Sequence, residues 1–228
     1  MNPAQKDAIR VYHYPLSPFC RKLRLVLAEK KIDFELREER YWERRSEFTI
    51  VNPAGTVPMM KMGNSFLSDS QAICEFVEDE FPIPMLIPND KQRAYEARRL
   101  VFWFDDKFNR EVTSRLVFER MLRRIQGKGP PDASRVSSAL RLLRMHMKYL
   151  HYLLDSRRWI AGERMTMADF AAAAHLSCLD YLNDVNWEYS STIKDWYSTL
   201  KSRPAFRPLL SDYIPGVRPP PHYSDLDF

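Results

Sequence analysis

The segment that decides the fold is Trp159-Ile-Ala-Gly-Glu-Arg-Met-Thr-Met-Ala-Asp-Phe170. Thr166 is a residue type that caps helices through its side-chain oxygen, and Asp169 follows three positions later. This spacing predicts a capping box, with Asp where Glu or Gln is more common. Met165 and Phe170 occupy the positions of a hydrophobic staple, which fixes the direction of entry into a helix. We therefore expect a helix that begins at Thr166.

The first 82 residues alternate strand and helix signals. The patterns cover Ile9–Tyr14 (strand), Pro18–Lys30 (helix), Phe34–Arg37 (strand), Val57–Met62 and Ser65–Ser68 (strands), and Ser70 to just before Pro82 (helix). The Gly63-Asn64 pair between the last two strands is a strong hairpin signal. The order β-α-β-α-β-β-α is typical of a thioredoxin-like domain.

The first of these helices, over Pro18–Lys30, is predicted to be amphipathic. Its apolar residues recur at helical spacing on one face. They are Leu23, Val26 and Leu27, and the charged residues Arg21, Lys22, Arg24 and Glu29 lie on the other face.

Beyond residue 82 the strand signals stop. A linker runs from Pro82-Ile83-Pro84 through Pro88, and Asn89 or Asp90 can cap a long helix that reaches about Gln126. Further helical patterns cover residues 136–154, a segment from Thr166, and residues 191–202. The last 25 residues contain six prolines, so we expect no further helix there. The expected domains are residues 1–82 (thioredoxin-like), 83–89 (linker), 90–213 (all-helical) and 214–228 (extended tail).

Three N-terminal motifs agree with the capping segment. They are Ser17-Pro-Phe-Cys20-Arg-Lys, Asn52-Pro-Ala-Gly-Thr-Val-Pro58 and Asp69-Ser70-Gln-Ala-Ile73. Together with residues 159–170 they resemble the active-site turn, the cis-proline loop, the acid-serine helix start and the folding signature of the glutathione S-transferase superfamily. The resemblance covers about residues 9–210. It implies an α/β thioredoxin-like N-terminal domain followed by an all-α C-terminal domain.

The resemblance also implies a glutathione site, intact or vestigial, at Ser17, Val57, Pro58, Asp69 and Ser70. In glutathione-binding relatives, a serine at the position of Ser17 donates a hydrogen bond to the thiolate. Ser17 and Asp69 could instead be helix caps, and Pro58 a structural turn. Cys20 would gain thiolate character from the helix dipole, but we favour a small packed side chain.

Composition excludes several classes of protein. No apolar run approaches the roughly 18 residues of a membrane-spanning helix, and the N-terminus lacks the apolar run of a secretory signal. The 3 cysteines are too few for a disulfide framework or a zinc site, and the 5 histidines show no metal-ligand spacing. We expect no metal, no membrane insertion and a cytoplasmic location.

The formal net charge of +5 is unevenly spread along the chain. Arg110–Lys148 holds ten basic residues against three acidic ones, Glu111, Glu119 and Asp132. Such a field attracts acidic partners, although a solvated helix face is an equally good interpretation. Nucleic acid is not the expected partner, because no aromatic-basic interleaving or DNA-reading motif accompanies the charge.

The C-terminal segment Ile214-Pro-Gly-Val-Arg-Pro-Pro-Pro-His-Tyr-Ser-Asp-Leu-Asp-Phe228 belongs to no catalytic pattern. Its three consecutive prolines favour a polyproline-type extension. Tyr223, Leu226 and Phe228 are apolar anchors spaced by Asp225 and Asp227. Disordered tails are poor in aromatic residues, so we favour a docking or interaction role over a frayed terminus.

With this tail, the Tyr41-Trp42 pair and the arginine-rich helical domain, the chain resembles the FtsZ-binding, glutathione S-transferase-like division proteins of bacteria. That resemblance implies a non-enzymatic homodimer at the division site that binds FtsZ, promotes filament curvature or bundling, and couples it to constriction and septal wall synthesis. It implies no cofactor and no bound glutathione. The candidate partner contacts are Trp42, Arg115, Glu119, Arg123, Arg124, Asp225, Asp227 and Phe228.

Several alternatives stay open. Trp42 could pack on the dimer partner, and Glu119 could pair within its helix with Arg115 or Arg123, each four residues away. The chain could also be a glutathione transferase that acts on a small electrophile through Ser17, or less favourably through Cys20. A third possibility is an adaptor of the stringent-starvation type, which shares the fold and binds transcription machinery.

Overall fold

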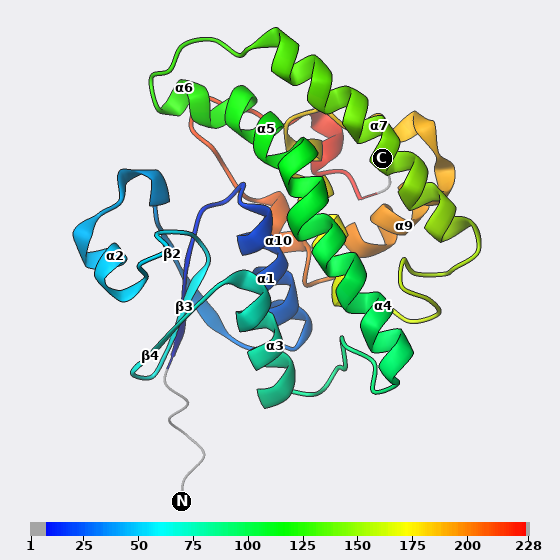
Figure 1. Cartoon of the computed structure of the whole chain (residues 1–228), viewed down its shortest axis with the longest axis horizontal. Coiled ribbons are helices and arrows are strands. Elements are labelled where there is room, and N and C mark those ends of the chain that lie inside the picture. Colours follow the sequence, from blue (N-terminus) through cyan, green and yellow to red (C-terminus); the bar gives the residue numbers. More distant parts are fainter. Residues whose placement is uncertain (1–7, 227–228) are drawn as a thin grey trace, which may run out of the picture.

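The computed structural model describes residues 8–226 and begins with a four-stranded sheet and its helices (Figure 1). The elements are β1 (Ile9–His13), α1 (Pro18–Glu29), β2 (Phe34–Glu38), α2 (Ser46–Val51), β3 (Met59–Met62), β4 (Ser65–Ser68) and α3 (Ser70–Glu80). The strand order is β2-β1-β3-β4, with β1 and β2 parallel and the other pairs antiparallel. Gly63, at φ 58°, turns the chain between β3 and β4 and confirms the predicted hairpin. The thioredoxin-like order is therefore confirmed.

A long helical segment follows the linker, as predicted. It comprises α4 (Lys91–Phe102), a π-helical stretch η2 (Trp103–Thr113), α5 (Ser114–Val117), a second π-helical stretch η3 (Phe118–Leu122) and α6 (Arg123–Ile125). Asp90 caps its start by accepting a hydrogen bond from the Arg93 backbone N–H at 3.0 Å. The π-helical stretches were not predicted, because the apolar periodicity of a sequence does not distinguish them from an α-helix.

Three more long helices follow: α7 (Ala133–Asp155), α8 (Met167–Tyr181) and α9 (Ser191–Lys201). Short 3₁₀ turns, η1 (Tyr41–Glu43) and η4 (Trp187–Tyr189), connect other elements. One side of α7, the buried seam, is apolar and packs into the core of the molecule. Its buried members are Val136, Leu143, Met147, Leu150 and Leu154.

The capping box at the start of α8 is confirmed. The Thr166 hydroxyl accepts a hydrogen bond from the Ala168 backbone N–H at 3.3 Å, and the Thr166 backbone N–H donates to Asp169 at 2.8 Å. Asp169 also accepts from the backbone N–H of Ile160 at 3.1 Å and from the indole of Trp196 at 3.0 Å. Every residue of α8 is buried, so this carboxylate ties the central helix to the segments around it.

The prediction that no helix forms after α9 is wrong. The chain makes α10 (Arg207–Leu210) and a 3₁₀ turn η5 (Pro221–Tyr223). Pro208 and Pro221 both stand in the first turn of their helix, where a missing N–H costs nothing and the fixed φ favours helical geometry. The tail is therefore extended only in part, because η5 folds its end back against the helical domain.

The charged face of α1 is buried, although an amphipathic helix is expected to show that face to water. Arg21, Lys22 and Arg24 all lie against the helical part, where α1 packs on α8. Lys22 pairs with Asp105 and donates to Gln71 at 3.0 Å. Since the sheet covers the other side, α1 is enclosed between two layers.

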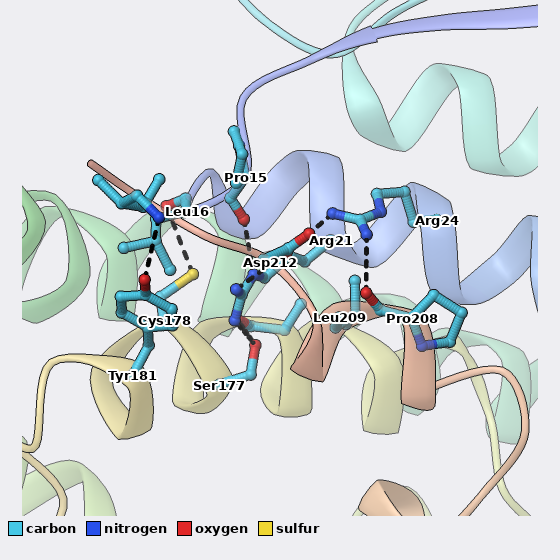
Figure 2. Close-up of polar contacts among 12 residues, drawn as sticks. Pro15, Leu16, Arg21, Arg24, Ser177, Cys178, Tyr181, Pro208, Leu209 and Asp212 are labelled. Carbon is cyan, nitrogen blue, oxygen red and sulfur yellow. Dashed lines mark hydrogen bonds and ion pairs between the residues drawn. The ribbon is translucent and has the colours of Figure 1, made fainter. Parts of the chain in front are cut away.

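Arg21 and Arg24 join the two domains through Asp212, as Figure 2 shows. The Arg21 guanidinium donates to the Pro15 carbonyl at 2.7 Å, to the Ser177 hydroxyl at 2.9 Å and to Asp212 at 3.1 Å. Arg24 donates to the same carboxylate oxygen at 2.9 Å. One carboxylate near the C-terminus thus neutralises two cations of the first helix.

We expect Asp212→Ala to lower the free energy of unfolding by about 3–5 kcal/mol, because it leaves two buried guanidinium groups unpaired. Urea denaturation followed by circular dichroism measures the change. Asp106→Ala is the matched control, since it breaks the exposed pair with Arg110 and is expected to leave the free energy of unfolding nearly unchanged. Equal losses in the two variants would contradict the structural role of Asp212.

Candidate functional site

The N-terminus of α1 carries the first predicted site residue, Ser17. Its Oγ accepts a hydrogen bond from the Cys20 backbone N–H at 3.3 Å, so Ser17 is the N-cap of α1. Its hydroxyl proton is not used in that bond and remains available to an acceptor. Ser17 also lines a cavity between the two domains, and both interpretations of this residue are compatible with the geometry.

Cys20 is not placed to act as a nucleophile. Its side chain is fully buried, and burial raises the pKa of its thiol to about 12 despite its position in the first turn of α1. A thiol in such surroundings stays protonated near neutral pH and is inert. The structure therefore supports the packed side chain and not the thiolate.

The Val57-Pro58 peptide bond is cis, as the resemblance implies. The Asn52 side-chain amide donates to the Thr56 carbonyl at 2.7 Å and holds the loop in front of it. Val57 and Pro58 are both buried, and the chain enters β3 directly after them. The cis-proline therefore places the Val57 backbone beside the N-terminus of α1, where Val57 and Ser17 line the same cavity.

Asp69 and Ser70 lie at the start of α3 and do not join Ser17. The Asp69 carboxylate accepts from the backbone N–H groups of Gln71 at 2.9 Å and Ala72 at 3.1 Å, which makes it the N-cap of α3. Both residues line a second cavity, of about 450 Å³, together with Glu75 and Arg98. Four of the five residues of the expected glutathione site thus line two cavities, Ser17 and Val57 the first and Asp69 and Ser70 the second, and Pro58 lines neither.

The cavity beside Ser17 measures about 320 Å³ and lies between the domains. The N-terminal domain lines it with Tyr14 and Tyr41, and the long helix lines it with Phe118 and Met121. Phe19 borders this cavity and the second one. The lining is mostly apolar, so the cavity favours a small apolar ligand with one polar group near Ser17.

Trp42 is half-buried in η1 and packs on its own domain. Its ring meets Tyr14 edge-on at a centroid distance of 4.8 Å and Tyr41 at 5.2 Å. These edge-to-face contacts hold Tyr14, Tyr41 and Trp42 together as one aromatic cluster of the N-terminal domain. The remaining exposed part of the indole is free to meet a partner.

Glu119 is only 2% exposed, contrary to the expectation that it contacts a partner. Its carboxylate accepts from the Asp132 backbone N–H at 2.9 Å and pairs with Arg123 at 3.6 Å and Arg135 at 3.6 Å. A buried carboxylate with these neighbours fixes the connection between α6 and α7. It could not reach a partner without breaking these contacts, so the pairing with Arg123 is the interpretation that the structure supports.

The three arginines of the expected partner surface differ in their surroundings. Arg123 is half-buried and donates to the Pro130 carbonyl at 2.7 Å, whereas Arg115 is exposed and donates to the Arg110 carbonyl at 3.0 Å. Arg124 is exposed, and its guanidinium lies against Gly216, where it would meet an added Cβ. Gly216, at φ 78°, therefore lets the tail turn beneath Arg124.

The tail is held by buried contacts. Tyr223 is fully buried, its ring meets Tyr181 at 5.1 Å, and its hydroxyl donates to the Leu209 carbonyl at 3.0 Å. Tyr223 is therefore an anchor within the chain and not a contact for a partner. Asp225 is exposed at the surface, whereas Asp227 and Phe228 lie outside the described residues.

Sequence reasoning missed the polar cluster under the tail. Asp180 is buried and accepts from Trp187 at 2.8 Å and from Tyr197 at 3.3 Å, and His222 lies 3.1 Å from it. Lys201 donates to the His222 carbonyl at 2.8 Å, and burial lowers the pKa of its ammonium group to about 8. No local motif indicates this cluster, because its members come from four separate segments.

Residues 8–226 contain neither a candidate metal site nor a candidate membrane-spanning helix. That part of the chain contains no group of three or more His, Cys, Asp or Glu side chains able to hold a metal ion. None of its helices is long and apolar enough to cross a membrane.

Family models of the glutathione S-transferase N-terminal domain and C-terminal domain match residues 11–84 and 116–204. FtsZ-localized protein A of Caulobacter vibrioides is 45% identical over 96% of this chain and 97% of its own length. Glutathione S-transferase 3 of Zea mays is 26% identical over 95% of this chain and 98% of its own length.

Solved structures agree with these matches. The structure of FzlA from C. crescentus has a TM-score of 0.94 and 43% identity, covering 97% of this chain and all of that one. A glutathione S-transferase from Rhodospirillum rubrum has a TM-score of 0.94 and 46% identity, covering 96% of this chain. The chain therefore belongs to the glutathione S-transferase superfamily and, within it, to the family that includes FtsZ-localized protein A.

Proposed function

We propose that this protein associates with FtsZ at the division site and acts there without catalysing a reaction. The observation that carries the proposal is the 45% identity to FtsZ-localized protein A over nearly the whole of both chains. Identity at this level over two full lengths favours a shared role as well as a shared fold. The buried Cys20 thiol supports the absence of thiol chemistry.

In finer detail, we propose that the protein is a homodimer that binds FtsZ directly, promotes curved or bundled filaments, and couples them to constriction and septal wall synthesis. A C2 dimer shows two copies of any binding surface, so it can bridge an FtsZ polymer and gain avidity. The exposed Arg115 and Arg124 form no ion pair among residues 8–226 and suit an acidic filament.

A glutathione transferase that acts on a small electrophile is the second candidate. The observation that favours it is the cavity of about 320 Å³ that Ser17 and Val57 line together. The Ser17 hydroxyl could donate to a thiolate placed there. Asp69 and Ser70 line the neighbouring cavity across Phe19, so a tripeptide would have to extend past Phe19 to reach them as well.

Glutathione titration and FtsZ co-pelleting on one preparation separate the two candidates. We expect no heat with glutathione, co-pelleting with FtsZ from the same organism, and unchanged co-pelleting for Ser17→Ala, because the adaptor does not need this hydroxyl. Tight glutathione binding that Ser17→Ala abolishes, without co-pelleting, would replace the adaptor with the enzyme.

The exposed end of the tail offers a second test. We expect Asp225→Lys to impair division in a complementation assay while the melting temperature stays unchanged, because Asp225 is exposed and Tyr223 still anchors the segment. Asp227→Lys is expected to act in the same way. Asp155→Lys, an exposed reversal at the end of α7, is the control. Full complementation by both tail variants would remove the tail from the partner surface.

Substitution of two exposed aromatic residues tests which face of the protein forms the dimer. Tyr95 and Phe102 are 67% and 68% exposed and stand seven positions apart on α4, so they share one face. We propose that this face meets the N-terminal domain of the partner, where Phe66 and Ile50 are also exposed. We expect the double variant Tyr95→Asp, Phe102→Asp to sediment as a monomer, because it places charges in an apolar contact. Tyr152→Asp on α7 is expected to stay dimeric, and an unaltered dimer in the double variant would rule out this face.

A further inference from the structure

The outer face of α7 carries a row of side chains that the fold does not use. The row consists of Arg141, Arg144, Met145, Lys148 and Tyr152, and we call it the α7 stripe. All five side chains are exposed, and they recur three or four positions apart, which places them on one side of the helix. The opposite side of α7 is the buried seam, so the stripe faces away from the core.

The cations of the α7 stripe are not neutralised. No Asp or Glu occurs between Asp132 and Asp155, so α7 supplies no acidic neighbour to them. The side chains of Arg141, Arg144 and Lys148 also form no ion pair with other parts of residues 8–226. Arg135, six residues before the stripe, differs because it pairs with Glu119 and Asp132.

Two large apolar side chains stand among these cations. Met145 is 64% exposed and Tyr152 is 71% exposed. They are seven positions apart, with Lys148 between them, so they form one short apolar ridge flanked by positive charge. A solvated helix face gains nothing from this arrangement, whereas Met and aromatic residues are adaptable anchors at protein interfaces.

We propose that the α7 stripe is a docking surface for an acidic amphipathic helix of a protein partner. Carboxylates on that helix would meet Arg141, Arg144 and Lys148, and its apolar side chains would cover Met145 and Tyr152. The stripe is about 17 Å long at 1.5 Å per residue, which matches about three turns of a partner helix. Charge complementarity would set the orientation and the rate of association.

A protein helix fits the stripe better than a membrane does. Helices that lie on membranes insert a broad apolar face and keep cations along its border. The broad apolar face of α7 is already buried in the core of the molecule. Two apolar side chains on the outer face are too few to hold it in a bilayer.

This surface is separate from the surfaces assigned above. The FtsZ contacts proposed earlier lie in η1, along α5 and α6 and in the tail, and the dimer contact lies on α4. The stripe therefore offers residues of its own to a second partner, and its test does not depend on FtsZ.

The test measures binding of a labelled helical peptide of roughly 20 residues by fluorescence anisotropy, using the full chain. The peptide consists of repeats of Glu-Leu-Glu-Glu-Leu-Glu-Ala, and a scrambled peptide of the same composition lacks its apolar face. The variant Arg141→Glu, Arg144→Glu, Lys148→Glu reverses the charge of the stripe. Lys91→Glu, Arg158→Glu, Arg207→Glu is the matched control, since these exposed cations lie elsewhere. Met145→Ala with Tyr152→Ala removes the apolar ridge, and thermal melting confirms that each variant is folded.

We expect the repeat peptide to bind, with a dissociation constant that rises at least about tenfold in the stripe variant and in the ridge variant. The matched control is expected to bind as the unaltered protein does, and the scrambled peptide to bind more weakly. Equal weakening in stripe and control variants would overturn the proposal, because net charge alone would then explain binding. Absence of peptide binding would overturn it as well. The proposal would also be overturned if the peptide does not bind, the protein binds phosphatidylserine vesicles, and the stripe variant loses that vesicle binding.

Discussion

The structure depends on the buried guanidinium group of Arg21. It donates to the turn before α1 through Pro15, to α8 through Ser177 and to the segment after α10 through Asp212, and it stands 5.9 Å from the centre of the Tyr223 ring. A guanidinium group cannot lose its proton inside a protein, so the enclosed α1 is stable only with these acceptors in place. One side chain near the start of the chain therefore fixes the central helix, the C-terminal segment and the tail relative to one another.

That constraint also determines what the N-terminus of α1 can do. Packing that encloses Arg21 encloses Cys20 one position earlier, and burial raises the pKa of the Cys20 thiol to about 12. Ser17 remains at the edge of the enclosed region, where it caps the helix and lines the cavity between the domains. A helix N-terminus alone favours an anion, but the low polarity around Cys20 outweighs that effect. The N-terminus of α1 thus presents the Ser17 hydroxyl to the cavity, while the Cys20 thiol is buried and stays protonated.

The parts of the fold that depend on neighbouring residues were predictable from sequence, and the parts that depend on distant residues were not. The capping box at Thr166 and the hairpin at Gly63 follow from spacing within a few residues, and both are confirmed. The burial of Arg21 follows from Asp212, which is 191 positions away, so no helical pattern could indicate it. Glu119 and Tyr223 looked like surface residues for the same reason. Their partners come from other segments, and only the assembled fold brings those segments together.

The cations of this protein fall into a buried group and an exposed group that the sequence cannot separate. Lys22 pairs with Asp105, Lys30 pairs with Glu78, and Arg24 pairs with Asp212, and all three cations are buried. The pairs of Lys22 and Arg24 join the two domains, whereas Lys30 pairs within the N-terminal domain. All three cations add little to the field outside, because a carboxylate lies beside each one. The field that a partner meets comes from exposed cations without a carboxylate, which gather on the long helix and on α7. Since salt screens exposed charges far more than buried ones, ionic strength distinguishes the two groups: it weakens association long before it weakens the fold.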